Sequence, residues 1–277
     1  MTTISTSLPA PTTSHYRPAG VLRSEWTKLR SVRSTTRTLA VTIIITIGIG
    51  IIAASTEASR WAHFAAQDRT TFDPTNLSLT GLQFGQLAIG VLGVLAISAE
   101  FGTGTIRSSL AAVPNRRTFL AAKAAVFTLV ALVVGEVVSF GSFFIGQAMI
   151  GGNVPHATIV QAGVLRAVVG GGLFLAVLGL IGLGLGAIIR HTAGAIAAFV
   201  GFVLILPAIV PALPLSWRHL INKFEPSTIG QAMTTVKFNG PSGAVSSLGP
   251  WGGFAVLCAY AAVALGLGAW LMMRRDA

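Results

Sequence analysis

The chain has 277 residues, of which 53% are hydrophobic and only 10% are charged, and its mean hydropathy is +0.76. Soluble domains carry charge on about a quarter of their residues, so this composition excludes an ordinary soluble protein and indicates an integral membrane protein. The net charge of +11 does not indicate nucleic-acid binding, because most of the basic residues flank apolar runs.

The N-terminal segment divides into a polar tail and a basic, striped segment. Residues 1–19 are rich in Thr, Ser and Pro and lack the apolar core of a signal peptide, so we expect a disordered cytoplasmic tail. After them, Leu22, Trp26 and Leu29 recur at i, i+4 and i+7 among Arg and Lys residues. This pattern predicts an interfacial helix that lies in the plane of the lipid headgroups. The alternative is a charge cluster that only sets the topology.

Six apolar stretches follow, each close to the roughly 20 residues that a helix needs to cross a bilayer. They run approximately over Thr38–Ala54, Leu82–Ala99, Ala121–Ile150, Val164–Ile189, Thr192–Leu213 and Trp251–Met273. The third is long enough to tilt or to break. Only Arg190 and His191 separate the fourth from the fifth, which predicts a tight helical hairpin. We expect residues 20–277 to form one six-helix membrane domain.

The Lys and Arg residues are distributed unevenly between the two sides of the membrane. With both termini inside, thirteen of the 19 fall on the cytoplasmic side, where positive residues are favoured. The sequence therefore predicts cytoplasmic termini. On the outer side, before the last span, Ile229, Met233 and Val236 recur at i, i+4 and i+7. They predict a short helix that lies on the outer membrane surface or dips into it.

Glu136 is the only acidic residue deep inside an expected span. A charge at the bilayer centre costs about 2.5–3.5 kcal/mol, so this side chain must face protein or water. One interpretation is a proton or substrate contact. The other, which we favour, is a structural hydrogen bond to a hydroxyl or amide of a neighbouring helix. Glycine pairs such as Gly182 and Gly186 have the spacing that allows close helix packing.

The chain has no motif for nucleotide or metal binding. It lacks G-x-x-x-x-G-K-[ST], so it has no P-loop to hold ATP phosphates, and its five His residues have no metal-ligand spacing. We therefore expect a protein that is not an enzyme, with no catalytic residues and no metal site.

The polar segment SAEFGTGTIRSSLAAVPNRR lies between the second and third spans. Glu100 falls at the membrane edge, and Gly102 and Gly104 allow the chain to turn. After the turn, Ile106 and Leu110 share one face of a short helix. A helix of this length is not stable alone in water, so it must dock either on the membrane surface or in a groove of another protein.

The stretch EFGTGTIRSSLAAVPNRRTFLAAKAAVF, with the earlier LRSEWTKLRSVRST, resembles ABC transporter permeases of the type-2 (ABC-2) exporter class, especially actinobacterial ones. The resemblance implies an all-α fold of six membrane helices, with an N-terminal interfacial helix and a cytoplasmic coupling helix between spans two and three. That helix would dock in a cleft of a separate ATPase, and we expect Ile106 and Leu110 to enter the cleft. The residues implied for coupling are Glu100, Gly102, Thr103, Ile106, Arg107 and Leu110.

The resemblance also implies partners and a mechanism. Two permease copies, identical or different, would pair in a bacterial plasma membrane, each with an ATPase that binds ATP and Mg, while this chain binds no cofactor. Export would proceed by alternating access. Two other functions stay open: an ion- or proton-coupled secondary transporter that uses Glu136, and a non-transporting scaffold or immunity protein.

Overall fold

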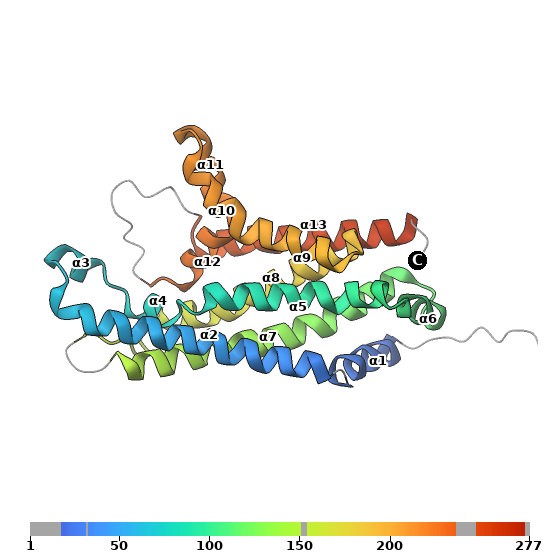
Figure 1. Ribbon diagram of the computed structural model, residues 1–277, viewed down its shortest axis with the longest axis horizontal. Helices are drawn as coiled ribbons and strands as arrows, with labels where there is room; N and C mark the ends of the chain where they lie inside the picture. Colours follow the sequence, from blue (N-terminus) through green and yellow to red (C-terminus); the bar gives the residue numbers. More distant parts are fainter. Residues whose placement is uncertain (1–17, 32, 151–153, 237–247, 275–277) are drawn as a thin grey trace, which may run out of the picture.

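The computed structural model describes residues 18–31, 33–150, 154–236 and 248–274, and Figure 1 shows their arrangement. Within these ranges all regular elements are helices, and six are long and apolar enough to cross a membrane, which confirms the expected all-α class. The first 17 residues of the expected tail lie outside the described residues. The six spans are α2 (Arg33–Arg60), α5 (Leu82–Gly102), α7 (Arg116–Met149), α8 (Val164–Ile189), an interrupted span that begins with α9 (Thr192–Val200), and α13 (Pro250–Arg274).

Shorter helices cover the two ends of the bundle. One end, here called the α6 end, carries α1 (Pro18–Ser31), α6 (Thr105–Ala112) and the C-terminal end of α13. The opposite end, the α4 end, carries the 3-10 turn Trp61–His63, α3 (Ala66–Thr71) and α4 (Pro74–Ser78). Successive spans run in opposite directions between these two ends.

Helix α8 forms the centre of the bundle and contacts α5, α7, α9, α12 and α13. Its contact with α5 depends on glycine. A Cβ on Gly182 would lie 2.1 Å from the Gly90 carbonyl oxygen, and one on Gly93 would lie 2.0 Å from the Gly179 carbonyl oxygen. Because any side chain would separate the two backbones, these positions explain why the spans are glycine-rich, as the small-residue spacing predicts.

The two spans with unusual features are the third and the fifth. Of the two possibilities for the third span, tilting or breaking, the continuous 34-residue helix α7 excludes a break. The fifth span is interrupted: α9 is followed by a π-helix at Gly201–Ile205, α10 (Leu206–Ile209) and a 3-10 turn at Val210–Ala212. Pro207 has no backbone N–H for an α-helical bond, and the wider turn pairs the Leu206 N–H with the Gly201 carbonyl instead. Beyond the turn, α11 (Leu215–Phe224) points away from the other helices.

Helix α12 (Pro226–Thr234) corrects the expectation of a helix on the outer membrane surface. Ile229 and Met233, 2% and 1% exposed, are buried against α8 and α13. Gly253 and Gly170 leave room for them, since a Cβ there would lie 2.9 Å from Ile229 and 3.1 Å from Met233. The periodicity identified the apolar face correctly, but that face packs inside the protein.

Candidate functional site

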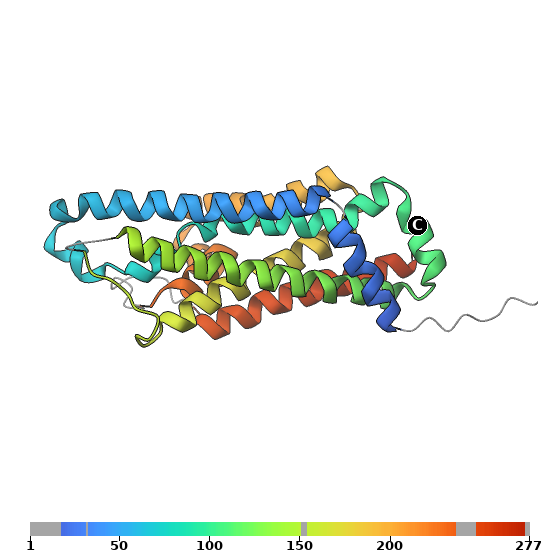
Figure 2. The ribbon, with the colours of Figure 1, turned by 90° about the horizontal axis from the view of Figure 1, so that it is seen from below.

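Helix α1 lies across the start of α7 at the α6 end (Figure 2). Its Val21 and Glu25 side chains are buried, while Leu22 and Trp26 on the neighbouring face are 40% and 44% exposed. Leu29 is half-buried. The stripe expected at the lipid headgroups is thus largely available to a membrane, although the sequence pattern did not reveal the second, protein-facing side of α1.

The turn between α5 and α6 depends on one glycine rather than two. Gly104 has φ = +73°, a left-handed conformation that is strained for residues with a Cβ. Gly102 instead ends α5 in a helical conformation, with open space where a Cβ would lie. The Thr103 hydroxyl donates to the Ala99 carbonyl oxygen at 2.8 Å and so extends the end of α5. The prediction that Gly102 makes the turn is therefore wrong, because the α-helix continues through it.

Helix α6 turns its apolar face toward its own chain. Ile106 is 2% exposed within the hydrophobic core, and Leu110 packs against the same core. Ile106 is therefore not available to a partner's cleft, which corrects the expectation for that residue, while Leu110 is half-buried. The side of α6 that a partner could reach instead carries exposed Arg107, Ser108 and Ala111.

Beneath α6 lies the ion cluster, formed by Glu25, Lys28, Glu100, Ser109 and Lys123. The Lys123 ammonium bonds Glu25 at 2.5 Å and Glu100 at 2.7 Å. The three side chains are 7%, 3% and 13% exposed, respectively, so these pairs are shielded from water. Glu25 comes from α1, Glu100 from α5 and Lys123 from α7. Charge-assisted bonds therefore join the N-terminal helix to two spans.

Lys28 and Ser109 complete the ion cluster on its water side. The Lys28 ammonium lies 2.7 Å from Glu25, 3.3 Å from Glu100 and 3.0 Å from the Ser109 hydroxyl, which in turn donates to Glu100 at 3.4 Å. Burial alone would lower the pKa of Lys28, but the bonds and charges of Glu25 and Glu100 outweigh it and raise that pKa above its ordinary value. Since Ser109 belongs to α6, the ion cluster holds four helices together.

An aromatic ring supports the two ammonium groups. Lys28 and Lys123 lie 5.6 Å and 5.3 Å from the centre of the Phe119 ring, which is buried. Cations over an aromatic face are stabilised by its negative charge density. The Phe119 ring thus stabilises both ammonium groups, in addition to the carboxylates that pair with them.

Of the residues expected in coupling, only Glu100 belongs to the ion cluster. No role at this site was expected for Glu25, Lys28, Ser109 or Lys123. One signal was present, because Glu25 is an acidic residue in an otherwise basic helix and stands three residues before Lys28, a spacing at which charges pair. No spacing in the sequence indicated that Glu25 also pairs with Lys123, which is 98 residues away.

Other basic residues at the α6 end hold the C-terminal end of α13. Arg116 donates to the Met272 carbonyl oxygen, and Arg190 donates to the Leu271 carbonyl oxygen at 3.1 Å. The last carbonyls of a helix have no partner within it, and cations there also complement its dipole. These arginines, expected only as topology signals, thus tie α7 and the α8–α9 hairpin to the final span.

Glu136 lies on α7 where that helix meets α8, half-buried. A Cβ on Gly172 would come within 2.5 Å of its carboxyl carbon, so the carboxylate occupies the space that this glycine leaves. The Oε2 atom is buried and makes no hydrogen bond within the described part of the chain. The structural hydrogen bond that we favoured is therefore absent for this oxygen.

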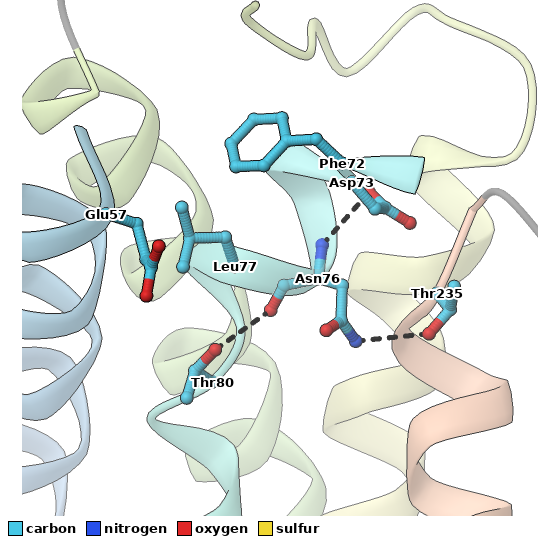
Figure 3. A pocket seen from close by; sticks show the side chains of 7 residues that line it. All are labelled: Glu57, Phe72, Asp73, Asn76, Leu77, Thr80 and Thr235. Carbon is cyan, nitrogen blue, oxygen red and sulfur yellow. Dashed lines mark hydrogen bonds between the residues drawn. The ribbon is translucent and has the colours of Figure 1, made fainter. Parts of the chain in front are cut away.

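A polar pocket of about 320 Å³ opens at the α4 end, as Figure 3 shows. Its lining consists of Glu57, Phe72, Asp73, Asn76, Leu77, Thr80 and Thr235. Asp73 accepts the backbone N–H groups of Thr75 and Asn76 at the start of α4, and the Asn76 side chain donates to Thr235 at 3.1 Å. These bonds connect α4 to the end of α12. Across the described ranges, no group of three or more His, Cys, Asp and Glu could hold a metal ion.

The sequence is similar to one known family over most of its length. The model of a family described as ABC-2 family transporter protein matches residues 21–216, which include most of α1, the ion cluster and the first five spans. No curated protein sequence matches the chain.

Proposed function

The chain belongs to the ABC-2 transporter family, and from that premise we propose that it is the permease subunit of an ATP-driven exporter. A separate ATPase would bind ATP and Mg, and a second permease copy would complete the pathway. The proposed location is a bacterial plasma membrane, with both termini in the cytoplasm. The α6 end would then face the cytoplasm, since that end carries most of the Lys and Arg residues.

The observation that carries this proposal is the ion cluster under α6. A short helix transmits force only if it is fixed to the elements that move. Ser109 links α6 to Glu100 of α5, and Lys123 of α7 bonds the same carboxylate. In the proposed mechanism, closure of the ATPase pair displaces α6 and, through these bonds, the cytoplasmic ends of α5 and α7. The bundle would thereby change from inward-open to outward-open.

The proposed ATPase contact is the exposed side of α6 and the preceding turn. It includes Thr103, Arg107, Ser108 and Ala111, while Ile106 and Leu110 serve as the anchor of α6 on its own core. This division differs from the one expected from sequence. The partner recognises the polar side of α6, and the apolar side makes the helix rigid.

The test places the same substitution at the two ends of the bundle. Ala111→Arg adds a long charged side chain to the exposed side of α6, and Ala62→Arg adds it to an exposed residue at the α4 end. Each variant is purified from its native host in mild detergent, and P-loop ATPases that accompany it are identified by mass spectrometry. We expect the ATPase with the wild type and with Ala62→Arg, and its loss with Ala111→Arg. Equal recovery with both variants would refute docking through α6.

Ion- or proton-coupled transport remains a second candidate, because the Oε2 atom of Glu136 is buried inside a span and has no hydrogen-bond partner among the described residues. A carboxylate in that position is available to a proton or a cationic substrate. Transport that survives ATP depletion and stops when the proton gradient collapses would favour this function over the ATP-driven one.

A further inference from the structure

A groove runs between α1 and α7, on the face of α1 next to the one that holds Glu25 in the ion cluster. It has a volume of about 420 Å³ and is lined by Leu22, Arg23, Trp26, Ala125, Val126 and Leu129. Five of these six side chains are apolar. Leu22, Trp26 and Leu129 are 40%, 44% and 53% exposed, so a large part of their surface has no cover within the described chain.

The groove continues as an apolar strip along α7. Leu129, Val133 and Val137 follow one another at intervals of four residues and are each more than half exposed. Residues with this spacing lie on one side of a helix. The strip leads from the groove toward the middle of the span, which in a membrane protein is the direction of a lipid acyl chain.

The charge at the groove indicates which chemical group a bound ligand should have. Arg23 is the only charged residue in the lining, and it is exposed. A guanidinium binds phosphate oxygens with paired hydrogen bonds. An occupant with a hydrocarbon chain and a phosphate at one end matches both features, and a basic helix at the headgroups further favours an anionic lipid.

We propose that the α1–α7 groove binds an anionic phospholipid, with one acyl chain between Trp26 and Leu129 and the phosphate on Arg23. The site depends on the membrane location of the chain and not on its ATPase. The bound lipid covers the face of α1 next to the one that holds Glu25 in the ion cluster. Because the lipid contacts both α1 and α7, it stabilises the packing of these two helices at a surface that the described chain does not cover.

The first test uses the fluorescence of Trp26 in a variant whose other tryptophans are replaced by phenylalanine. The variant is reconstituted in vesicles containing either phosphatidylglycerol or phosphatidylcholine, each brominated on its acyl chains, at equal mole fraction. Bromine quenches a tryptophan that it touches. We expect phosphatidylglycerol to bind in the groove about fivefold more tightly than phosphatidylcholine. One basic residue near the membrane surface contributes about 1 kcal/mol to the binding of an anionic lipid, which corresponds to this ratio. Equal quenching by the two lipids would overturn the proposal.

Matched variants separate a defined site from general attraction. Arg23→Gln should abolish the preference for phosphatidylglycerol. Arg30→Gln, about 10 Å further along α1 and outside the lining, should leave it unchanged. Ala125→Phe should fill the groove and reduce quenching by both lipids, whereas Ala121→Phe, exposed on α7 but outside the lining, should not. Equal effects within either pair would show that the groove is not the site.

A second measurement needs no tryptophan replacement. The wild-type chain and Arg23→Gln are purified in detergent, titrated with phosphatidylglycerol, and examined by native mass spectrometry. The wild type should retain one phosphatidylglycerol at collision energies that remove it from Arg23→Gln. The same retention by both proteins would contradict the proposal, even if the variant with four tryptophan replacements failed to fold.

Discussion

Replacing Lys123 by methionine keeps most of the length of the unbranched side chain and removes its charge. Glu25 and Glu100, 3% and 13% exposed, then share only Lys28, which is 41% exposed. The two carboxylates repel one another, and α1 loses its bond to α7. We expect α1 and α6 to open locally far more often than in the wild type, while the six spans remain inserted.

The size of the effect follows from the bonds removed. A hydrogen bond to a charged group contributes about 1.5–3 kcal/mol, and breaking one partner out of a buried ion pair costs about 3–5 kcal/mol. Lys123 makes two such bonds, at 2.5 Å and 2.7 Å, but Lys28 remains to neutralise part of the charge. We therefore expect about 3 kcal/mol, which corresponds to roughly a 150-fold increase in the open population.

Hydrogen exchange measured by mass spectrometry on the reconstituted protein reports this opening directly, because amides of α1 and α6 exchange when those helices detach. Peptides from α1 should exchange roughly 100-fold faster in Lys123→Met, and peptides from α8 should be unchanged. The raised pKa of Lys28 adds a pH dependence. Its ion pairs contribute fully below the ordinary value of 10.5 and lose their effect only as the pH rises through the raised pKa. The contribution of the Lys28 ion pairs should therefore be unchanged at all pH values up to about 9.

Two controls test whether the ion cluster holds α1 on the bundle. Lys223→Met is the same substitution at the α4 end, where Lys223 lies over the Phe224 ring, and it should leave exchange in α1 unchanged. Combining Glu25→Gln with Lys123→Met should cost less than the sum of the single changes, by about 2 kcal/mol, since the two residues contact each other. Exchange in α1 within threefold of the wild type, or strict additivity, would refute the claim that the ion cluster holds α1.

The remaining predictions concern topology, the turn and the buried acid. On a background without the native cysteine, Ser108→Cys should resist a membrane-impermeant thiol reagent in intact cells and Ala62→Cys should react; the reverse labelling would overturn the orientation. Gly104→Ala should lower the thermal stability in detergent, because a Cβ at φ = +73° costs about 1–2 kcal/mol, whereas Gly102→Ala should be neutral; equal melting shifts would contradict our account of the turn. Glu136→Leu should raise the stability by about 1 kcal/mol, because it removes a buried oxygen without a partner; a lower melting temperature would reveal a bond that the structure lacks.

The existence of the spans could be predicted from sequence because hydrophobic length alone determines it. The fourth span was predicted at Val164–Ile189, the bounds that α8 has. The interruption of the fifth span could not be foreseen in detail. Pro207 signals a missing hydrogen bond, but whether the chain kinks, breaks or widens into a π-turn depends on what surrounds it.

The apolar faces of the short helices were also predicted, but not what covers them. The spacing of Ile106 and Leu110, and of Ile229 and Met233, shows that one side of each helix avoids water. It does not distinguish a membrane, a partner or the protein's own core. In both helices the apolar side packs against the protein's own core. Neighbouring helices leave room for these side chains, as Gly253 of α13 does for Ile229.

By itself the sequence determined the membrane class, the number of spans and the presence of a short helix after Glu100, since each follows from local composition and periodicity. Tertiary structure alone decided that Glu100 meets Lys123 and that Lys123 meets Glu25, 98 residues earlier. Such pairs form because helix packing brings distant residues together in a place shielded from water, where opposite charges attract strongly. No spacing within one helix encodes that meeting, so the ion cluster became visible only in the folded chain.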